Sequence, residues 1–591
     1  MLTDIIRIKT FKAIQSIYAI ELSERDLQVN LTKPEFEGDY TIVLFSLIKS
    51  LKKNPDEIGN TIGNYLVEKE SAFFESYNII KGFLNLVLKS EFLLNMLNQH
   101  YQDPCFGKAA MNEKKIMVEY SSPNTNKPLH LGHLRNNFLG RSIAEILKAN
   151  GYDVAKTCIV NDRGVHICKS MIAWKRFANG ATPSSTNKKG DHFVGDYYVM
   201  FNDAYKTEVE ELVQKGMSKA DAEKEAPIMK ETQQMLIDWE NGKPEVIELW
   251  KTMNQWVYDG FEITYRRIGS DFDKTYYESN TYLLGKDTIE MGLKNGVFFK
   301  KDDGSVWIDL TSEGLDEKLV LRGDGTSVYI TQDIGLAQLK YDEFNIDQSI
   351  YVVGDEQNYH LKVLQLICKK LGLPYADGIH HLSYGMVELP TGKMKSREGT
   401  VVDADDLIDE MVSIAAAHTQ ELGKVKEFSE VELKELYDTI GLGALKFFLL
   451  RVDPKKKMIF NPEESIDFHG FTGPFIQYTH ARIKSVLRKN DLHPSMHDFI
   501  EPLHKMEKEL LIQCELFEQT LKQAGQSLDP STLSMYLFQL AQSFNSFYAA
   551  LSISNAETEQ KKQLRLKISS MVATILKSGM QLLGINVPEK M

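Results

Sequence analysis

The sequence predicts a multidomain α/β protein built on a doubly wound parallel sheet and followed by a helical region. Three observations support this prediction. The chain has 591 residues, enough for three or four domains. Between residues 116 and 160 a strand, a polar loop, a helix and a second strand follow one another, as in parallel sheets. From about residue 430 onward the apolar residues recur almost entirely at helical spacing.

The composition is that of a globular protein with large cores, with 43% hydrophobic and 26% charged residues. The sequence contains no apolar run of about 18 residues and no secretory signal, so no membrane partner is expected. The five cysteines are scattered without a C-x-x-C spacing, which predicts a cytoplasmic protein without a zinc site. The net charge of −13 argues against nucleic-acid binding, although an acidic protein can present one basic face.

Residues 1–110 predict a small α+β domain in front of the sheet. An apolar run at 42–51 follows a turn. Asn54 and Pro55 then suit the start of a helix, because proline needs no amide partner in the first turn. Residues 82–88 alternate in polarity, which predicts a strand.

The central unit of the chain runs from Ile116 to Gly151. Its apolar start predicts a strand, a loop rich in turn formers follows, and the apolar residues after Pro128 recur at a helical period. The helix therefore begins with the segment His130-Leu131-Gly132-His133. A helix start offers unbonded N–H groups and a positive dipole end, which suit a polyphosphate. Gly132 leaves room for a nucleotide to approach the backbone.

A second strand is predicted at 154–160, and it ends in Asn161-Asp162-Arg163-Gly164. The highly charged residues from about 176 to 260 then predict a helical insertion between the halves of the sheet. Its acidic runs are solvated faces on the simplest interpretation, and the sequence assigns the insertion no chemistry.

The second half of the sheet follows the insertion. Residues 329–335 predict a strand or strand end that turns into a helix, and further strands are predicted at 349–353 and 381–389. A basic loop flanked by glycines comes next, at 391–400. A mobile loop of this kind can close over phosphates and reopen.

Three segments carry a resemblance to a known family. They are VEYSSPNTNKPLHLGH at 118–133, ALKFFLLR at 444–451 and GPFIQYTHARI at 473–483. They resemble class I aminoacyl-tRNA synthetases, and arginyl-tRNA synthetases in particular. The resemblance covers nearly the whole chain and implies a class I Rossmann-type catalytic domain at 111–430. It also implies an N-terminal domain at 1–110 that contacts the tRNA D-loop, and an all-α anticodon-binding domain at 431–591.

The resemblance implies an arginine–tRNA ligase, in which arginine attacks the α-phosphate of ATP and tRNA then takes the arginyl group from the adenylate. ATP enters with Mg²⁺ as a substrate complex, and no dedicated protein metal site is expected. The family's KMSKS motif falls in the basic loop but lacks its second lysine, which Lys127 is expected to replace. The expected catalytic residues are Lys127, His130, His133, Lys393, Lys395 and Arg397, and nucleotide contacts are also expected from Gly132, His360 and Met394.

Recognition of arginine needs a planar, negative partner, because a guanidinium carries five donors in a fixed fork and stays charged. Asp333 is the first candidate, and Tyr329 is placed to pack on the guanidinium face. The family pattern implies three more contacts with arginine, from Glu119, Asn124 and Gln357.

The tRNA contacts implied by the resemblance lie at both ends of the chain. An exposed Phe83 and Asn85 suit base stacking and hydrogen bonding, and Phe475, Tyr478 and the terminal Met591 are expected at the anticodon. The alternatives are that Phe83 is core and that the Phe475–Tyr478 pair is buried between helices. The resemblance implies tRNA(Arg) as the partner and a monomeric enzyme, and activation of arginine is expected to need bound tRNA.

Two alternatives stay open at this point. One is a class I ligase for another amino acid, and the other is a catalytically silent tRNA-binding or regulatory relative. A local departure concerns Arg163, because the family usually has an aromatic residue there, whereas Asp162 matches the pattern. Aromatic packing at that corner is therefore in question.

Overall fold

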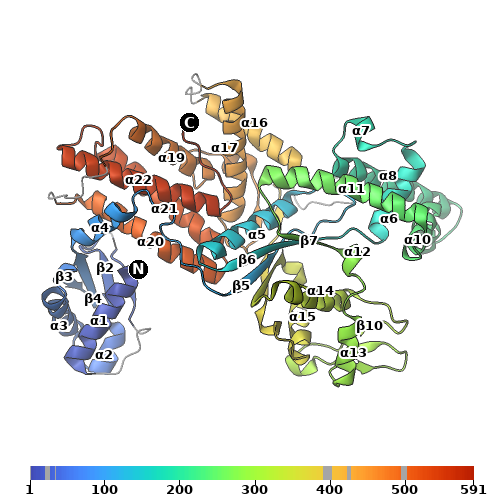
Figure 1. Ribbon diagram of the computed structural model, residues 1–591, viewed down its shortest axis with the longest axis horizontal. Coiled ribbons are helices and arrows are strands. Elements are labelled where there is room, and N and C mark those ends of the chain that lie inside the picture. The colour runs from blue at the N-terminus through green and yellow to red at the C-terminus, as the bar shows by residue number, and fades with distance from the viewer. Residues whose placement is uncertain (1, 20–26, 34, 391–401, 422–427, 494–501) are drawn as a thin grey trace.

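A computed structural model describes residues 2–19, 27–33, 35–390, 402–421, 428–493 and 502–591. The predicted residues Lys393, Met394, Lys395 and Arg397 lie outside these ranges. Figure 1 shows a parallel sheet at the centre, with the N-terminal domain and the C-terminal helices on one side and a helical insertion on the other. One large core extends through the N-terminal domain, the central sheet and the C-terminal helices.

The N-terminal domain is a four-stranded antiparallel sheet covered by helices. The strand order is β1-β2-β4-β3, with β1 at Val29–Leu31, β2 at Tyr40–Val43, β3 at Phe74–Ile80 and β4 at Phe83–Leu88. Its helices are α1 (Leu2–Tyr18), α2 (Phe45–Leu51) and α3 (Pro55–Lys69). The predicted helix start is confirmed, because the Asn54 side chain caps α3 and Pro55 opens it. The predicted strand at 82–88 corresponds to β4 and is also confirmed.

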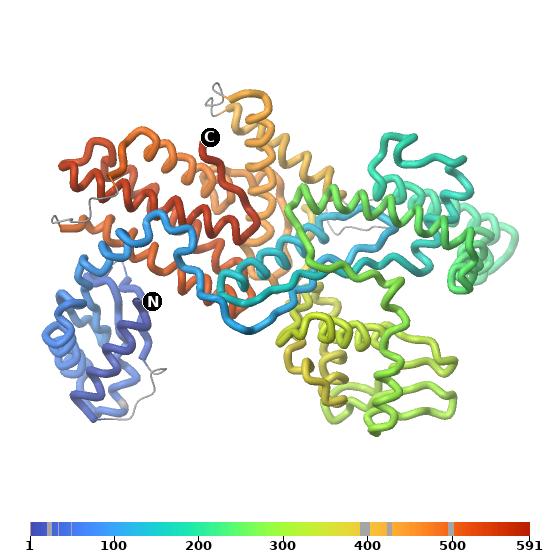
Figure 2. Tube along the Cα trace, in the orientation of Figure 1, coloured from blue at the N-terminus to red at the C-terminus, as the bar shows by residue number. Residues whose placement is uncertain are grey.

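After α4 (Ser90–His100) the chain runs along the C-terminal helices before it enters the central sheet (Figure 2). This sheet has five parallel strands in the order β12-β11-β5-β6-β7. The bounds are β5 Lys115–Glu119, β6 Asp153–Val160, β7 Lys274–Tyr277, β11 Gln348–Gly354 and β12 Ile379–Tyr384. The predicted strand–helix–strand unit is confirmed, with α5 (Leu131–Ala149) between β5 and β6. The strand order reverses between β5 and β11, where sheets of this type bind ligands.

Helices occupy the predicted insertion, which lies between β6 and β7 rather than between the halves of the sheet. It comprises α7 (Pro183–Thr186), α8 (Gly190–Gln214), α9 (Lys219–Glu225), α10 (Pro227–Glu240) and α11 (Pro244–Ile268), and α6 (Val165–Phe177) precedes it. A second, smaller core follows β7 and extends to the start of β12, and it was not predicted. It is built on a three-stranded antiparallel sheet, with β8 at Phe299–Lys300, β9 at Val306–Ile308 and β10 at Lys318–Leu321. The helices of this region are α12 (Glu278–Thr281), α13 (Lys286–Lys294), α14 (Tyr329–Phe344) and α15 (Asn358–Lys370).

The predicted strand or strand end at 329–335 is wrong, because these residues form the first turns of α14. The Val328 N–H donates to the Thr331 hydroxyl over 3.0 Å and caps the helix. Ile330 and Ile334 are both buried on one face of α14. Seven residues are too few to separate this helical spacing from the alternation of a strand.

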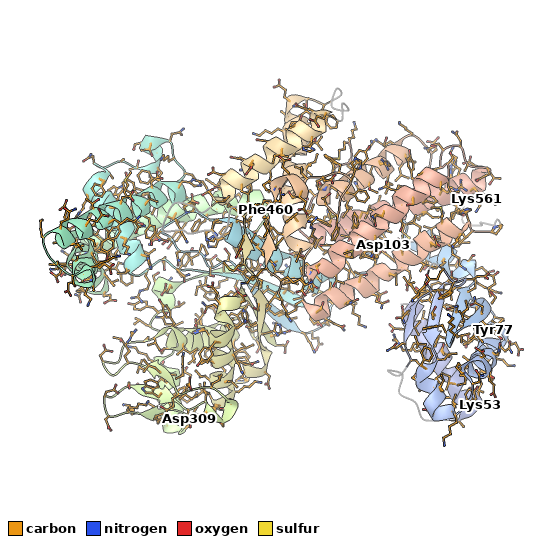
Figure 3. The ribbon with its side chains drawn as sticks, turned by 180° about the vertical axis from the view of Figure 1, so that it is seen from behind. Lys53, Tyr77, Asp103, Asp309, Phe460 and Lys561 are labelled. Atoms are coloured by element: carbon orange, nitrogen blue, oxygen red, sulfur yellow. The ribbon has the colours of Figure 1, made fainter. Side chains whose placement is uncertain are left out.

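The predicted strand at 381–389 is divided into β12 and the short β13 (Val387–Glu388), which pairs with β14 (Met458–Ile459) in a separate sheet. Gly385 lies between them, where a Cβ would come within 2.7 Å of the Lys456 backbone. Phe460 follows β14 and is fully buried near the centre of the molecule (Figure 3). Its ring packs edge-on against Phe448 at 5.3 Å, which fixes this small sheet to the C-terminal helices.

The C-terminal region is helical, as predicted. Its helices are α16 (Ala404–Glu421), α17 (Glu430–Leu450), α18 (Pro462–Ser465), α19 (Gly473–Arg488), α20 (Lys505–Ser527), α21 (Pro530–Ala550) and α22 (Glu559–Leu582). Pro474 lies in the first turn of α19, and Asp529 caps α21. Among the helices that the described residues form, none combines the length and apolar character needed to cross a membrane.

Candidate active site

The two histidines at the start of α5 form a bonded pair. The Gly132 N–H donates to Nδ1 of His130 over 3.2 Å, and the His130 N–H donates to Nδ1 of His133 over 3.1 Å. The ring centroids lie 3.8 Å apart. Because both Nδ1 atoms accept, each neutral ring carries its proton on Nε2 and can donate it outward.

Burial sets the charge of this pair. It lowers the pKa of His130 to about 3, and the nearby Lys127 ammonium adds to the shift. Burial also lowers the pKa of His133 well below its ordinary value, with further contributions from His130 and Lys127. Both imidazoles are therefore neutral hydrogen-bond donors at physiological pH, a question that the sequence left open. Burial lowers the pKa of Lys127 too.

The chain on either side of residues 391–401 lies against the start of α5. On one side, the Leu131 N–H donates to the Val402 carbonyl over 3.3 Å, and the Ala404 N–H donates to the Leu129 carbonyl over 2.9 Å. On the other side, β13 lies against α5. The predicted proximity of the basic loop to the His130 turn itself stays a prediction, because residues 391–401 lie outside the described residues.

Five predicted substrate residues line one cavity of about 390 Å³ at the carboxyl ends of β5 and β11, namely Glu119, Tyr329, Asp333, Gln357 and His360. Asn124 lines a neighbouring cavity of about 630 Å³, and Asn161 and Tyr329 belong to the walls of both. The first cavity thus lies at the point of the sheet where its strand order reverses.

Asp333 enters this cavity from the first turns of α14 rather than from a strand end. Its carboxylate lies 2.5 Å from Nε2 of His360. His360 therefore borders the arginine candidates, and its expected contact with the adenine or ribose stays a prediction. The Tyr329 side chain is 78% exposed, so its ring is not used in packing the protein core.

Glu119 has an internal partner that sequence reasoning missed. Lys340 of α14 is fully buried, and its Nζ lies 2.5 Å from the Glu119 carboxylate and 4.7 Å from the Tyr351 ring centroid. No local signal in the sequence pairs Glu119 with Lys340, because the two residues lie far apart along the chain and meet only through tertiary packing.

The corner after β6 is packed with aromatic rings although Arg163 departs from the family pattern. The Arg163 guanidinium carbon lies 3.9 Å from the Tyr282 ring centroid and 5.2 Å from that of Trp239. Asp162 is buried and accepts hydrogen bonds from the Ser279 N–H and hydroxyl, at 2.8 and 2.7 Å. The cation thus occupies an aromatic cage and preserves the packing that was in question.

The expected exposure of Asn85 is wrong. Asn85 is fully buried on the inner strand β4, where it accepts from the Thr41 hydroxyl over 2.6 Å and donates to Asn78 over 2.8 Å. A buried amide is tolerated on this inner strand because its oxygen and its nitrogen both form hydrogen bonds. Phe83 is half-buried, and its ring packs edge-on against Phe45 at 5.4 Å.

The candidate anticodon residues are also half-buried. The Phe475 ring packs against Phe538 at 5.1 Å, and the Arg482 guanidinium lies 4.9 Å from the Tyr478 ring centroid. Met591 packs partly against the core. Each therefore keeps some accessible surface for a partner.

Comparison with known proteins decides the family. The chain matches "Arginyl tRNA synthetase N terminal domain" at residues 5–88, "tRNA synthetases class I (R), catalytic domain" at 94–461 and "DALR anticodon binding domain" at 476–591. Arginine–tRNA ligases of Flavobacterium psychrophilum and Bacteroides thetaiotaomicron are each 53% identical to it, over 98% of both chains. The chain belongs to the arginyl-tRNA synthetase family. It is therefore an aminoacyl-tRNA ligase, and neither alternative drawn from the sequence finds support.

The architecture agrees with solved structures of the same family. The Thermus thermophilus arginyl-tRNA synthetase aligns over 100% of both chains with a TM-score of 0.79 and 24% identity. The alignment with the Plasmodium falciparum arginyl-tRNA synthetase covers 100% of this chain and 99% of that protein's chain, with a TM-score of 0.78 and 18% identity. The predicted multidomain α/β fold is thus confirmed.

Proposed function

We propose that this enzyme converts arginine and ATP to arginyl-adenylate and pyrophosphate at the carboxyl end of β5. It then transfers arginine from the adenylate to a ribose hydroxyl of tRNA(Arg). The observation that carries the proposal is the gathering of four of the five predicted arginine residues, Glu119, Tyr329, Asp333 and Gln357, in one cavity at the strand-order reversal. The loop that continues β5 leads directly to the His130 turn. An amino acid in the cavity and a nucleotide at the helix start would therefore be neighbours.

Arginine binds with its guanidinium toward Asp333, which offers a carboxylate for a charge-assisted pair. Tyr329 covers the guanidinium face, because its exposed ring is available for stacking. Glu119 keeps its position through Lys340 and, with Asn124 and Gln357, orients the ammonium and carboxylate ends of the substrate. The attacking carboxylate is thereby held toward the α-phosphate.

The neutral His130 and His133 donate their Nε2 protons to phosphate oxygens, which stabilises charge that develops at phosphorus. Gly132 borders the nucleotide. Positive charge at the departing pyrophosphate comes from Lys127 and from Lys393, Lys395 and Arg397 of the basic loop, in which Met394 borders the nucleotide. Mg²⁺ arrives on the ATP phosphates, because the groups at the helix start are donors that fit phosphate oxygens rather than a cation.

The tRNA spans the ends of the chain, with the domain at 1–110 at its D-loop and the domain at 431–591 at its anticodon. Phe475, Tyr478 and Met591 supply stacking and apolar surface to the unstacked bases, and Phe83 contributes at the other end. The enzyme acts as a monomer in the cytoplasm. Four of its five cysteines are buried and all five are free thiols, which suits a reducing compartment.

One assay tests the reaction and its dependence on tRNA. In a panel of amino acids, we expect arginine alone to be attached to tRNA, because the other side chains cannot satisfy Asp333. ATP–pyrophosphate exchange should be nearly absent until cognate tRNA is added. Attachment of a different amino acid would overturn the assignment, and equal exchange with and without tRNA would overturn the dependence.

A further inference from the structure

Lys189, the residue just before α8, joins three elements at a partly buried site. Its Nζ lies 3.0 Å from Asp191 of α8, 2.5 Å from the Thr264 hydroxyl of α11 and 2.6 Å from Asp405 of α16. The Lys189 side chain is only 17% exposed, and Asp191 and Thr264 are fully buried. Ion pairs in such settings are screened far less by water and salt than surface pairs.

A second cation belongs to this cluster. His192 Nε2 lies 3.1 Å from Asp405 and 3.5 Å from Asp403. The bond to Asp405 raises the pKa of His192, and the neighbouring Asp403 and Asp191 add to the rise. Burial opposes ionisation of Asp405, but the bonds from His192 and Lys189 still hold the pKa of this carboxyl well below its usual range. Asp191, His192 and Asp405 also have the spacing of a metal site, but Lys189 already supplies a positive charge among them.

Asp405 anchors the chain that lies on the His130 turn. It is the second residue of α16, and the preceding residues run antiparallel to the turn, with His130 opposite Asp403. The hydrogen bonds of Leu131 with Val402 and of Ala404 with Leu129 join the two segments. Any displacement of Asp405 is therefore transmitted to the backbone that carries His130.

The insertion touches the same turn a second time. Gly195 of α8 faces Pro128, and a Cβ on Gly195 would come within 2.9 Å of the Pro128 ring and 3.7 Å of the Lys127 backbone. The first turns of α8 thus contact the segment 127–131 directly at Pro128 and indirectly through Asp405. Close packing of this kind transmits small shifts, because protein interiors are hardly compressible.

We propose that Lys189 and Asp405 are positioning residues for arginyl-adenylate formation, through which the helical insertion fixes the turn that carries Lys127 and His130. The proposal rests on the catalytic role proposed for that turn. It gives the insertion, which carried no assigned chemistry, a part in the reaction, because its helix α8 sets the geometry of the phosphate donors.

The test compares Lys189→Met, Lys189→Arg and Asp405→Asn in the full-length enzyme. We expect Lys189→Met and Asp405→Asn to lower kcat of aminoacylation about 10- to 100-fold, as misplacement of a reacting group by about 1 Å does. The KM for arginine should stay unchanged, because the arginine cavity does not include this cluster. Lys189→Arg should restore most of the activity. Lys188→Met is the matched control, since Lys188 forms an exposed pair with Asp196 and should leave kcat unaltered.

The pH dependence separates positioning from a general loss of structure. In Lys189→Met, His192 is the remaining cation of the cluster formed with Asp191, Asp403 and Asp405. Activity relative to the wild type should therefore fall as the pH rises and His192 loses its proton. A relative activity that does not vary with pH would overturn the proposal.

Two further outcomes are decisive. A Lys189→Met enzyme with the same kcat as Lys188→Met would overturn the positioning role. A Lys189→Met enzyme that loses both thermal stability and activity, neither of which Lys189→Arg restores, would also overturn it. His130→Ala, measured in parallel, keeps the two proposals distinguishable. An active His130→Ala enzyme would overturn the proposed catalytic turn itself. An inactive one, beside a fully active Lys189→Met, would overturn only the inference about the insertion.

Discussion

The two carboxylates of the arginine cavity differ in their partners. Glu119 is held by Lys340, which is buried and belongs to the protein core. Asp333 is held by the imidazole of His360 at the cavity wall, at 2.5 Å. A fixed ammonium keeps Glu119 in place, whereas an imidazole can give way to a guanidinium, which presents two parallel donors. We therefore propose that specificity for arginine depends on Asp333.

Asp333→Asn should raise the KM for arginine about 10- to 100-fold, because a charge-assisted bond is worth about 1.5–3 kcal/mol and the amide cannot accept from both donors. Steady-state aminoacylation at saturating ATP and tRNA measures the effect. Asp342→Asn on the same helix is the control, since Asp342 is an exposed partner of Gln338. If both variants keep the wild-type KM, the guanidinium does not bind at Asp333.

At the level of elements, the sequence predicted what depends on local spacing. The start of α5 with its histidine pair was found because apolar residues at helical period follow a proline-rich turn. The short strands β8 to β10 were missed, since two to four residues carry too little period to detect. The pair of Glu119 with Lys340 could not be predicted either. It is set by tertiary packing between residues that are far apart in the sequence.

The C-terminal tail is held between two helices in a way that the sequence did not indicate. Glu589 lies 3.1 Å from Lys484 of α19 and 3.3 Å from Lys577 of α22. Arg488 donates to the Glu589 carbonyl over 2.8 Å. The tail that ends in Met591 is thus tied to α19, the helix that also carries Tyr478.

Glu589→Ala should therefore weaken tRNA binding without affecting the small substrates. Two partly exposed ion pairs of up to about 1 kcal/mol each predict a rise in the KM for tRNA of about 3- to 10-fold. The KM values for arginine and ATP should stay unchanged, because the adenylate site proposed above lies at the central sheet. Glu559→Ala, at the exposed start of α22, is the control. An unchanged KM for tRNA would show that the tail position does not matter for binding.

At the scale of the whole molecule, Lys446 links the C-terminal helices to the central sheet. It lies on α17, buried, and its Nζ donates to the Gly584 carbonyl of the tail over 2.6 Å. The same Nζ lies 5.6 Å from the ring centroid of Phe138 on α5. Burial, with a smaller contribution from Arg141, lowers the pKa of Lys446 from 10.5 to about 7. The stability that Lys446 contributes between the C-terminal helices and the central sheet therefore depends strongly on pH.

The direction of this dependence follows from proton binding. Between about pH 7 and 10.5 the unfolded chain holds a proton on Lys446 that the folded chain lacks, so the stability contributed by this residue rises with pH. Over the two units from about pH 7 to about pH 9 the rise is about 2–3 kcal/mol. Lys446→Met has a similar shape but no ionisable group, so the wild type should gain Tm relative to it as the pH increases.

Thermal unfolding of both proteins at several pH values measures this difference. Lys484→Met serves as the control, because the Lys484 side chain is 34% exposed and its removal should shift Tm equally at each pH. A Tm difference between the wild type and Lys446→Met that is constant from about pH 7 to about pH 9 would contradict the linkage. It would mean that Lys446 keeps its proton in the folded state. Lys446 would then contact the tail and α5 as a charged ammonium rather than as a neutral amine.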